Sequence, residues 1–168
     1  MSSRSFRHVL ALLHDCEQEI SAVLDRAVEL ADAERARLTL AKTTDPGRLV
    51  RWFGPLAPLG RVAPMCEPDL DAMAGHRLAR AAELIPAEIP VSTVLLGRNT
   101  PRALRGLVAS GCHDLLVLAA TELSHDAKLR RELRRLELCT LAVACDGVWT
   151  RALTPPHASA ASNPLPHA

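Results

Sequence analysis

The sequence predicts a single α/β domain in which a parallel β-sheet is covered by helices on both faces. Short apolar runs alternate with amphipathic stretches in the order β-α-β-α-β-α-β-α-β. Strands that alternate with helices pair in parallel, and right-handed crossovers place the helices on both sides of the sheet. At 168 residues the chain is of single-domain size, and with 48% apolar but only 2% aromatic residues its core must consist of Leu, Val, Ile and Ala.

The first three elements follow from their hydrophobic patterns. HVLALL (8–13) is a continuous apolar run, which is typical of a central strand covered on both faces. Residues 17–36 repeat apolar side chains at steps of three and four, as an amphipathic helix does, and Asp15 is the expected N-cap. RLTLAKT (37–43) is the second expected strand.

A long excursion follows the second strand. Residues 44–68 contain five prolines and three glycines, too many for a regular element. Loops of this length serve as lids, as interface arms or as mobile segments. Trp52 and Phe53 lie inside it, and they either hold the loop on its own domain or contact a partner or ligand.

The middle of the chain predicts one more strand between two helices. A helix over 69–88 should end just before Pro86, since proline disfavours helix at the residue that precedes it. IPVSTVLLG (89–97) is rich in β-branched residues and is expected to be a strand. The next helix is expected to begin after Asn99 and to end at Gly111 in the left-handed conformation.

Two further strands and a tail complete the prediction. CHDLLVLAA (112–120) is the fourth strand, Ser124 is the expected N-cap of the helix after it, and CTLAVAC (139–145) is the fifth strand. The remaining residues are rich in Pro, Ala and Ser and are expected to be disordered. The predicted organisation is therefore a domain over 1–148 and a tail over 149–168.

The charge of the chain argues against polyanionic partners. Twenty Lys and Arg residues against nineteen Asp and Glu residues give a net charge of +1, which provides no global field toward nucleic acid or an anionic membrane. The apolar run near the start is shorter than a signal sequence or a membrane span. We therefore expect a cytoplasmic protein that binds neither nucleic acid nor membrane.

The five cysteines have no spacing that suggests zinc, so no metal site is expected. Cys112, Cys139 and Cys145 lie in or beside apolar strands, where a cysteine behaves as a small hydrophobic residue. Cys16 lies close to a helix start, where a thiol pKa can be lowered, so its reactivity stays open.

Two segments resemble the universal stress protein family, and the resemblance covers about residues 6–146. GRNTPRALRGLVASGCHDLLVLAA (97–120) is similar to the family's helix followed by the strand "A-D-L-I-V-M-G", and LELCTLAVAC (136–145) resembles its final strand "H-A-P-C-P-V-L-V-V". The resemblance implies a flavodoxin-like fold of the adenine nucleotide α-hydrolase type, with a five-stranded parallel sheet in the order 3-2-1-4-5.

The chain departs from the family's pattern for ATP. Family members that bind ATP carry Gly-x-x-Gly, about nine residues, and then Gly-Ser/Thr after the fourth strand, because small residues let backbone N–H groups close on the triphosphate. Here the first glycine falls at Ala119, with Ala120 as the next residue, and the later Gly-Ser/Thr pair falls at Ala127 and Lys128. The connection also appears shortened, so no ATP cofactor is expected.

A small anionic ligand such as AMP is the alternative occupant, in the crevice at the carboxyl ends of the strands. Lys128, in the first turn of its helix, would meet a phosphate, and the family's nucleotide-contacting aspartate falls on His14 with Asp15 one place later. The candidate ligand-binding residues are Leu13, His14, Asp15, Ala41, Thr43, Ala119, Ala120, His125 and Lys128.

The main hypothesis is a non-enzymatic stress-response domain that acts through protein contacts. No catalytic residue is expected, because the sequence has no Ser-His-Asp elbow, H-E-x-x-H, Walker loop or G-x-G-x-x-G. The resemblance implies a homodimer, and CTLAVAC is expected to be an apolar edge strand that a lysine at Val143 would keep from pairing. The expected dimer interface consists of Thr140, Leu141, Ala142, Val143 and Ala144.

Overall fold

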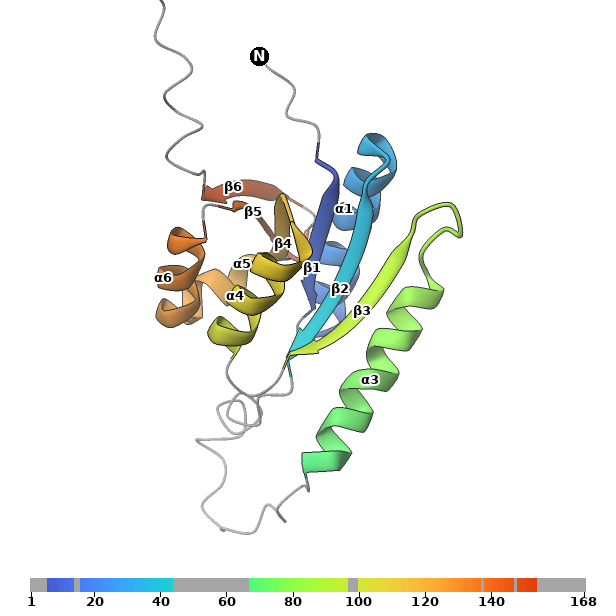
Figure 1. Ribbon diagram of the computed structural model, residues 1–168, viewed down its shortest axis with the longest axis horizontal. Helices are drawn as coiled ribbons and strands as arrows, with labels where there is room; N and C mark the ends of the chain where they lie inside the picture. Colours follow the sequence, from blue (N-terminus) through green and yellow to red (C-terminus); the bar gives the residue numbers. More distant parts are fainter. Residues whose placement is uncertain are drawn as a thin grey trace, which may run out of the picture.

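The computed structural model of the chain describes residues 6–13, 16–43, 67–96, 100–136, 138–146 and 148–153 (Figure 1). Helices and strands alternate along the chain as predicted, and one short helix and one strand are additional. The elements are β1 (His8–Leu13), α1 (Glu17–Glu34), β2 (Arg37–Thr43), α3 (Glu67–Glu83), β3 (Val91–Leu96), α4 (Thr100–Gly111), β4 (Leu115–Ala119), α5 (Ala120–His125), α6 (Ala127–Arg135), β5 (Cys139–Val143) and β6 (Trp149–Leu153).

One sheet runs through the molecule in the order β3-β2-β1-β4-β5-β6. The first five strands are parallel and follow the predicted order 3-2-1-4-5, which confirms the fold class. β1 is central as predicted, since it pairs with β2 on one side and β4 on the other. β6 pairs with β5 in the antiparallel direction.

The two faces of the sheet carry separate apolar cores. Val9 and Ala11 of β1 pack with residues of α1 and α3, whereas Leu10 and Leu12 pack with residues of α4 and α6. Because successive side chains of a strand point to opposite faces, this alternation places α1 and α3 on one face and α4 and α6 on the other. In Figure 1, α4 lies in front of the sheet and α1 behind it.

The sixth strand corrects the expectation of a tail that begins at residue 149. Trp149 and Thr150 pair with Val143 and Ala142 of β5. The turn between the strands is closed by a bond from Ala144 N to the Val148 carbonyl oxygen at 2.8 Å. Residues 154–168 lie outside the described residues, and the domain division otherwise stays a prediction.

Because β6 covers β5, the expectation that CTLAVAC is an edge strand is wrong. The backbone of β5 pairs with β4 on one side and with β6 on the other. Of the expected interface residues, Ala144 is half-buried and the other four are buried, namely Thr140, Leu141, Ala142 and Val143, with exposed fractions of 0% to 5%. A second copy cannot pair with this backbone while β6 is in place.

The predicted helix caps also need correction. The N-cap of α1 is Cys16, which makes no side-chain cap bond, and Asp15 lies outside the described residues. Ser124 belongs to α5, where its hydroxyl donates to the Thr121 carbonyl oxygen at 2.7 Å. The cap of α6 is instead Asp126, whose Oδ1 accepts from two backbone amides of the first turn, each at 2.9 Å.

The end of α4 differs from the expected glycine stop. Cys112, with φ of 52°, takes the left-handed conformation in place of Gly111. Gly111 serves a different purpose, because a Cβ built on it would lie 2.1 Å from Cε1 of His113. The glycine therefore makes room for an imidazole ring.

The long segment with Trp52 and Phe53, expected to be a lid or an interaction arm, lies outside the described residues. Within the part of the chain that the structure describes, no helix has both the length and the apolar character that a membrane crossing requires.

Candidate functional site

The carboxyl ends of the five parallel strands meet at one edge of the sheet, where doubly wound folds bind ligands. β4 ends at Ala119 and α5 begins at the next residue, Ala120, so the place of the family's glycine loop is taken by a helix. This arrangement agrees with the loss of glycine in the sequence. The connection after β4 is thus the helix α5, followed directly by Asp126, the N-cap of α6.

A buried carboxylate joins three elements at this edge. Glu19, in the first turn of α1, is 7% exposed. Its Oε1 accepts a hydrogen bond from the Thr121 hydroxyl at 2.7 Å, and the Cys145 thiol lies 4.0 Å from the same oxygen. Thr121 stands in α5 and Cys145 follows β5, so Glu19 reaches across the ends of β4 and β5.

Two more charged side chains are buried nearby in the fold. Glu122 of α5 is 4% exposed and Lys42 of β2 is 3% exposed. Lys42 leaves its strand on the same face as Leu38 and Leu40, which is the face that α1 covers. The edge therefore combines two buried carboxylates, Glu19 and Glu122, with one buried ammonium group.

The structure divides the predicted ligand-binding residues into three groups. Those inside the strands are buried, and Ala120 is half-buried. His125 and Lys128 are exposed, and the Lys128 amide donates to the Asp126 cap. The buried residues are Leu13, Ala41, Thr43 and Ala119, while His14 and Asp15 lie outside the described residues.

The sequence analysis missed Glu19, Lys42, Thr121 and Glu122. Lys42 carried a signal, since it is the one charged residue inside the apolar segment LTLAKT. Glu19 carried none, because its hydrogen-bond partner Thr121 is 102 positions away.

The cysteines correct one expectation and leave another untested. Cys139 is buried as a small hydrophobic residue would be, but Cys112 and Cys145 are exposed. Cys16 is half-buried at the start of α1, and Cys66 lies outside the described residues. Among the described residues, no group of three or more His, Cys, Asp or Glu could hold a metal ion.

A second polar cluster lies at the opposite edge, where the strands begin. The rings of His8 and His113 stack with centroids 4.0 Å apart and planes tilted by 34°. His8 Nδ1 lies 2.8 Å from the Gly111 carbonyl oxygen, and because a carbonyl only accepts, this nitrogen carries the hydrogen. In neutral His8, Nε2 therefore accepts from the Thr39 hydroxyl, which lies 2.8 Å away.

Thr39 links this cluster to the next strand. Its hydroxyl oxygen lies 2.9 Å from the Ser92 hydroxyl and 3.3 Å from His113 Nε2. When the Thr39 proton goes to His8, the oxygen accepts from both of these groups. The network ties the starts of β1, β2 and β3 to the connection between α4 and β4, and His113 Nδ1 is buried without a hydrogen-bond partner among the described residues.

Burial, followed by repulsion from His8, lowers the pKa of His113 from 6.5 to about 4. Below pH 6.5 the unfolded chain binds a proton that the folded chain rejects until about pH 4. We therefore expect the free energy of unfolding to fall by about 2 kcal/mol between about pH 7 and about pH 4.5 from this group alone.

Urea unfolding at the two pH values measures this loss in wild type and in His113→Gln, which keeps a hydrogen-bonding side chain without titration in this range. His125→Gln, at an exposed position, is the matched control and should keep the wild-type pH dependence. An unchanged pH dependence in His113→Gln would contradict the assignment.

The described geometry defines a doubly wound α/β domain with a buried glutamate, Glu19, at the carboxyl edge of its sheet. Comparison with protein-family models and with curated proteins found no match. Among solved structures, 33 chains match, and several are universal stress proteins.

Three of these structures cover most of the chain. A universal stress protein in complex with cAMP superposes with a TM-score of 0.57 at 22% identity, over 83% of this chain and 98% of that one. The universal stress protein from Archaeoglobus fulgidus gives 0.56 at 13% identity, over 82% and 92%. UspA from Lactobacillus plantarum gives 0.53 at 17% identity, over 84% and 99%. The chain has the universal stress protein fold.

Proposed function

We propose that this chain is a non-enzymatic universal stress protein-like domain that does not bind ATP and that acts in the cytoplasm as a homodimer, through protein contacts in a stress response. The observation that carries the proposal is the Glu19 carboxylate, held by Thr121 at the carboxyl edge of the sheet. A triphosphate at this edge would have to displace or approach that carboxylate.

Electrostatics supports the proposal. Glu19 and Glu122 are both buried, so a carboxylate charge on either would be weakly screened and would repel a triphosphate brought beside it more strongly than in water. The connection acts in the same direction, because α5 follows β4 directly and leaves no glycine-rich loop there whose backbone N–H groups could close on phosphates.

A thermal-shift and calorimetric titration with ATP, AMP and cAMP tests the proposal. We expect no stabilisation of wild type by ATP at millimolar concentration, because the carboxylates oppose the phosphates. Glu19→Gln neutralises the buried side chain at this edge. Glu29→Gln makes the same substitution at an exposed position of the same helix and is the matched control. Micromolar binding of ATP to wild type would overturn the proposal.

The second candidate function is the binding of AMP or another small anion in the same crevice. Lys42 favours it, since a buried ammonium group at the carboxyl edge offers a counter-charge. One protein with this fold was solved in complex with cAMP. Stabilisation by AMP or cAMP that Lys42→Met abolishes would favour this function. If Lys128→Ala abolishes the stabilisation instead, the exposed Lys128 would be the residue that holds the anion.

The homodimer requires a surface other than the β5 backbone. Among the described strands, β3 and β6 stand at the two ends of the sheet, and the helical layers cover its faces. Light scattering coupled to size-exclusion chromatography decides whether copies associate, and a monomer at every concentration tested would remove this part of the proposal.

A further inference from the structure

The two helical layers carry opposite charge. α1 contains six acidic residues and one basic residue, a net charge of −5. α4 and α6 together contain seven basic residues and one acidic residue, a net charge of +6. The net charge of the whole chain, +1, hides this separation.

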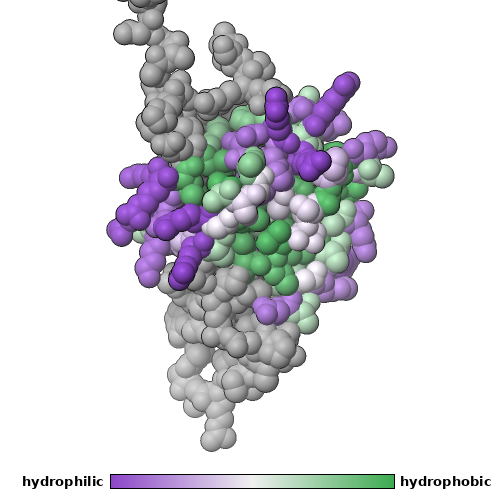
Figure 2. Space-filling model, in the orientation of Figure 1, coloured by the Kyte–Doolittle hydropathy of each residue, from purple (hydrophilic) through white to green (hydrophobic). Residues whose placement is uncertain are grey.

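The opposed charges lie on opposite sides of the sheet. α1 covers one core, and α4 and α6 cover the other. Figure 2 shows hydrophilic side chains gathered on the side of the molecule where Figure 1 places α6. The molecule therefore has an acidic face and a basic face, which a single copy cannot bring together.

Each face presents its charges in a row. Asp25, Glu29 and Asp32 are exposed along α1, and we call them the acidic stripe. Residues at such spacing share one side of a helix, and the eight residues from first to last span about 10 Å. Arg26 flanks the stripe and pairs with Glu29 at 2.6 Å, leaving Glu29 67% exposed.

The basic stripe consists of Lys128, Arg131 and Arg135, which are exposed along α6 at comparable spacing. It also covers eight residues from first to last, about 10 Å. Its length therefore matches that of the acidic stripe.

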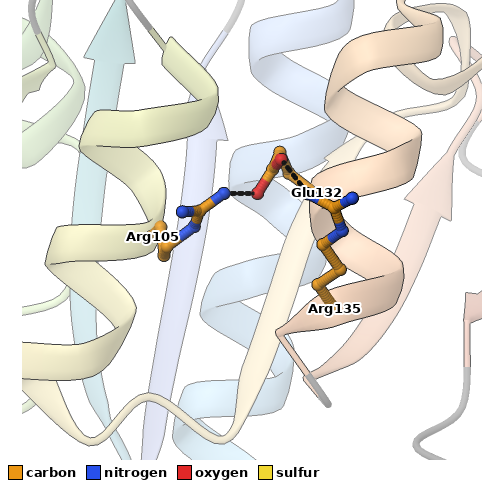
Figure 3. Close-up of polar contacts among 3 residues, drawn as sticks. All are labelled: Arg105, Glu132 and Arg135. Atoms are coloured by element: carbon orange, nitrogen blue, oxygen red, sulfur yellow. Dashed lines mark hydrogen bonds and ion pairs between the residues drawn. The ribbon is translucent and has the colours of Figure 1, made fainter.

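An ion-pair cluster holds one end of the basic stripe in place. Glu132 accepts from Arg105 of α4 and from Arg135 of its own helix, the latter at 3.1 Å (Figure 3). The hydrogen bond from Arg105 is the main cause that lowers the pKa of Glu132, so this carboxylate stays charged. Arg135 remains 63% exposed, so its guanidinium group is positioned and still accessible.

We propose that the acidic stripe of one copy docks on the basic stripe of a second copy. It goes beyond the homodimer of the proposed function and rests on that function only for the association of copies, because a contact between two different surfaces does not close after two copies. Matching length and opposite charge favour the contact, whereas either stripe would repel itself across a two-fold axis. Because the stripes lie on opposite faces, each bound copy offers a free stripe to the next, and association continues head to tail.

A charge-swap experiment tests the contact in the full-length protein. Lys128→Glu/Arg131→Glu reverses the basic stripe, and Asp25→Lys/Asp32→Lys reverses the acidic stripe. Each variant alone should associate at least about tenfold more weakly than wild type, because like charges then meet. An equimolar mixture of the two variants should recover association, since opposite charges meet again.

Matched controls carry the same change of charge elsewhere on the surface. Arg37→Glu/Arg80→Glu and Glu83→Lys/Glu88→Lys alter exposed residues outside the stripes and should associate like wild type. Sedimentation velocity gives the masses, first at about 0.1 M and then at about 1 M salt, where the Debye length shrinks from ~10 Å to ~3 Å. Wild-type association should be lost at the higher salt.

Three results would overturn the proposal: a wild-type monomer at low salt, association that neither reversal weakens, or a mixture that fails to recover it. A wild-type monomer that binds an acidic polymer through the basic stripe would assign that stripe to another partner. The nucleotide titration is independent, so tight ATP binding would reject the closed crevice without affecting this contact. Conversely, a salt-resistant dimer untouched by both reversals would reject the stripes and leave the homodimer intact.

Discussion

Val143→Lys should unfold the domain instead of producing a soluble monomer. Val143 is 1% exposed, packs in the core on the α1 side and lies in a strand paired on both sides. An ammonium group at this position would lose its hydration without gaining a designed counter-charge, which costs several kcal/mol. We expect the free energy of unfolding to fall by about 4 kcal/mol or more, a large part of the stability of a typical domain.

Urea unfolding followed by circular dichroism measures the loss. Val148→Lys is the matched control, because Val148 is 61% exposed in the turn after β5 and the same substitution there should change stability by less than about 0.5 kcal/mol. A folded, monomeric Val143→Lys protein of nearly wild-type stability would mean that β5 is an open edge after all.

Gly111→Ala is expected to cost about 2 to 3 kcal/mol, although alanine usually stabilises a helix relative to glycine. The new Cβ would lie 2.1 Å from Cε1 and 2.6 Å from Nδ1 of His113. The ring cannot move away cheaply, because it stacks on His8 and its Nε2 bonds Thr39. Either the imidazole leaves its network or the end of α4 shifts.

A double-mutant cycle isolates the collision. In a His113→Ala background Gly111→Ala should cost little, and the coupling free energy then measures the steric conflict. Gly106→Ala is the control within the same helix, since nothing lies within 4 Å of its added Cβ, and it should stabilise by about 0.5 to 1 kcal/mol. An equal cost of Gly111→Ala in both backgrounds would contradict the proposed role of the glycine.

The fold was largely predictable because the strands are defined by local pattern. β1 and β2 lie where HVLALL and RLTLAKT predicted them, since uninterrupted apolar runs leave few alternatives. β6 was missed because WTRAL is a short segment beside a region of Pro, Ala and Ser. Its strand conformation depends on pairing with β5, which no local pattern of these five residues reveals.

Only one feature of the candidate site could be predicted from the sequence, namely the consequence of missing glycine after the fourth strand. The absence of glycine after the fourth strand predicted that no glycine-rich loop follows it, and α5 begins there directly. The burial of Glu19 could not be predicted from the sequence. A buried glutamate needs a hydrogen-bond partner, and the partner here, Thr121, lies in a different helix far along the chain. Likewise, the pair of His8 and His113 forms only when β1 and β4 become neighbours.

The antiparallel pairing of Trp149–Leu153 has a practical consequence for shortened versions of this protein. A polypeptide truncated after residue 148, where composition alone would place the end of the domain, would leave backbone N–H and C=O groups unpaired along one side of Cys139–Val143. An unpaired edge strand of this kind can pair with strands of other molecules and promote aggregation. Recombinant material intended for crystallisation or binding assays should therefore extend beyond Leu153.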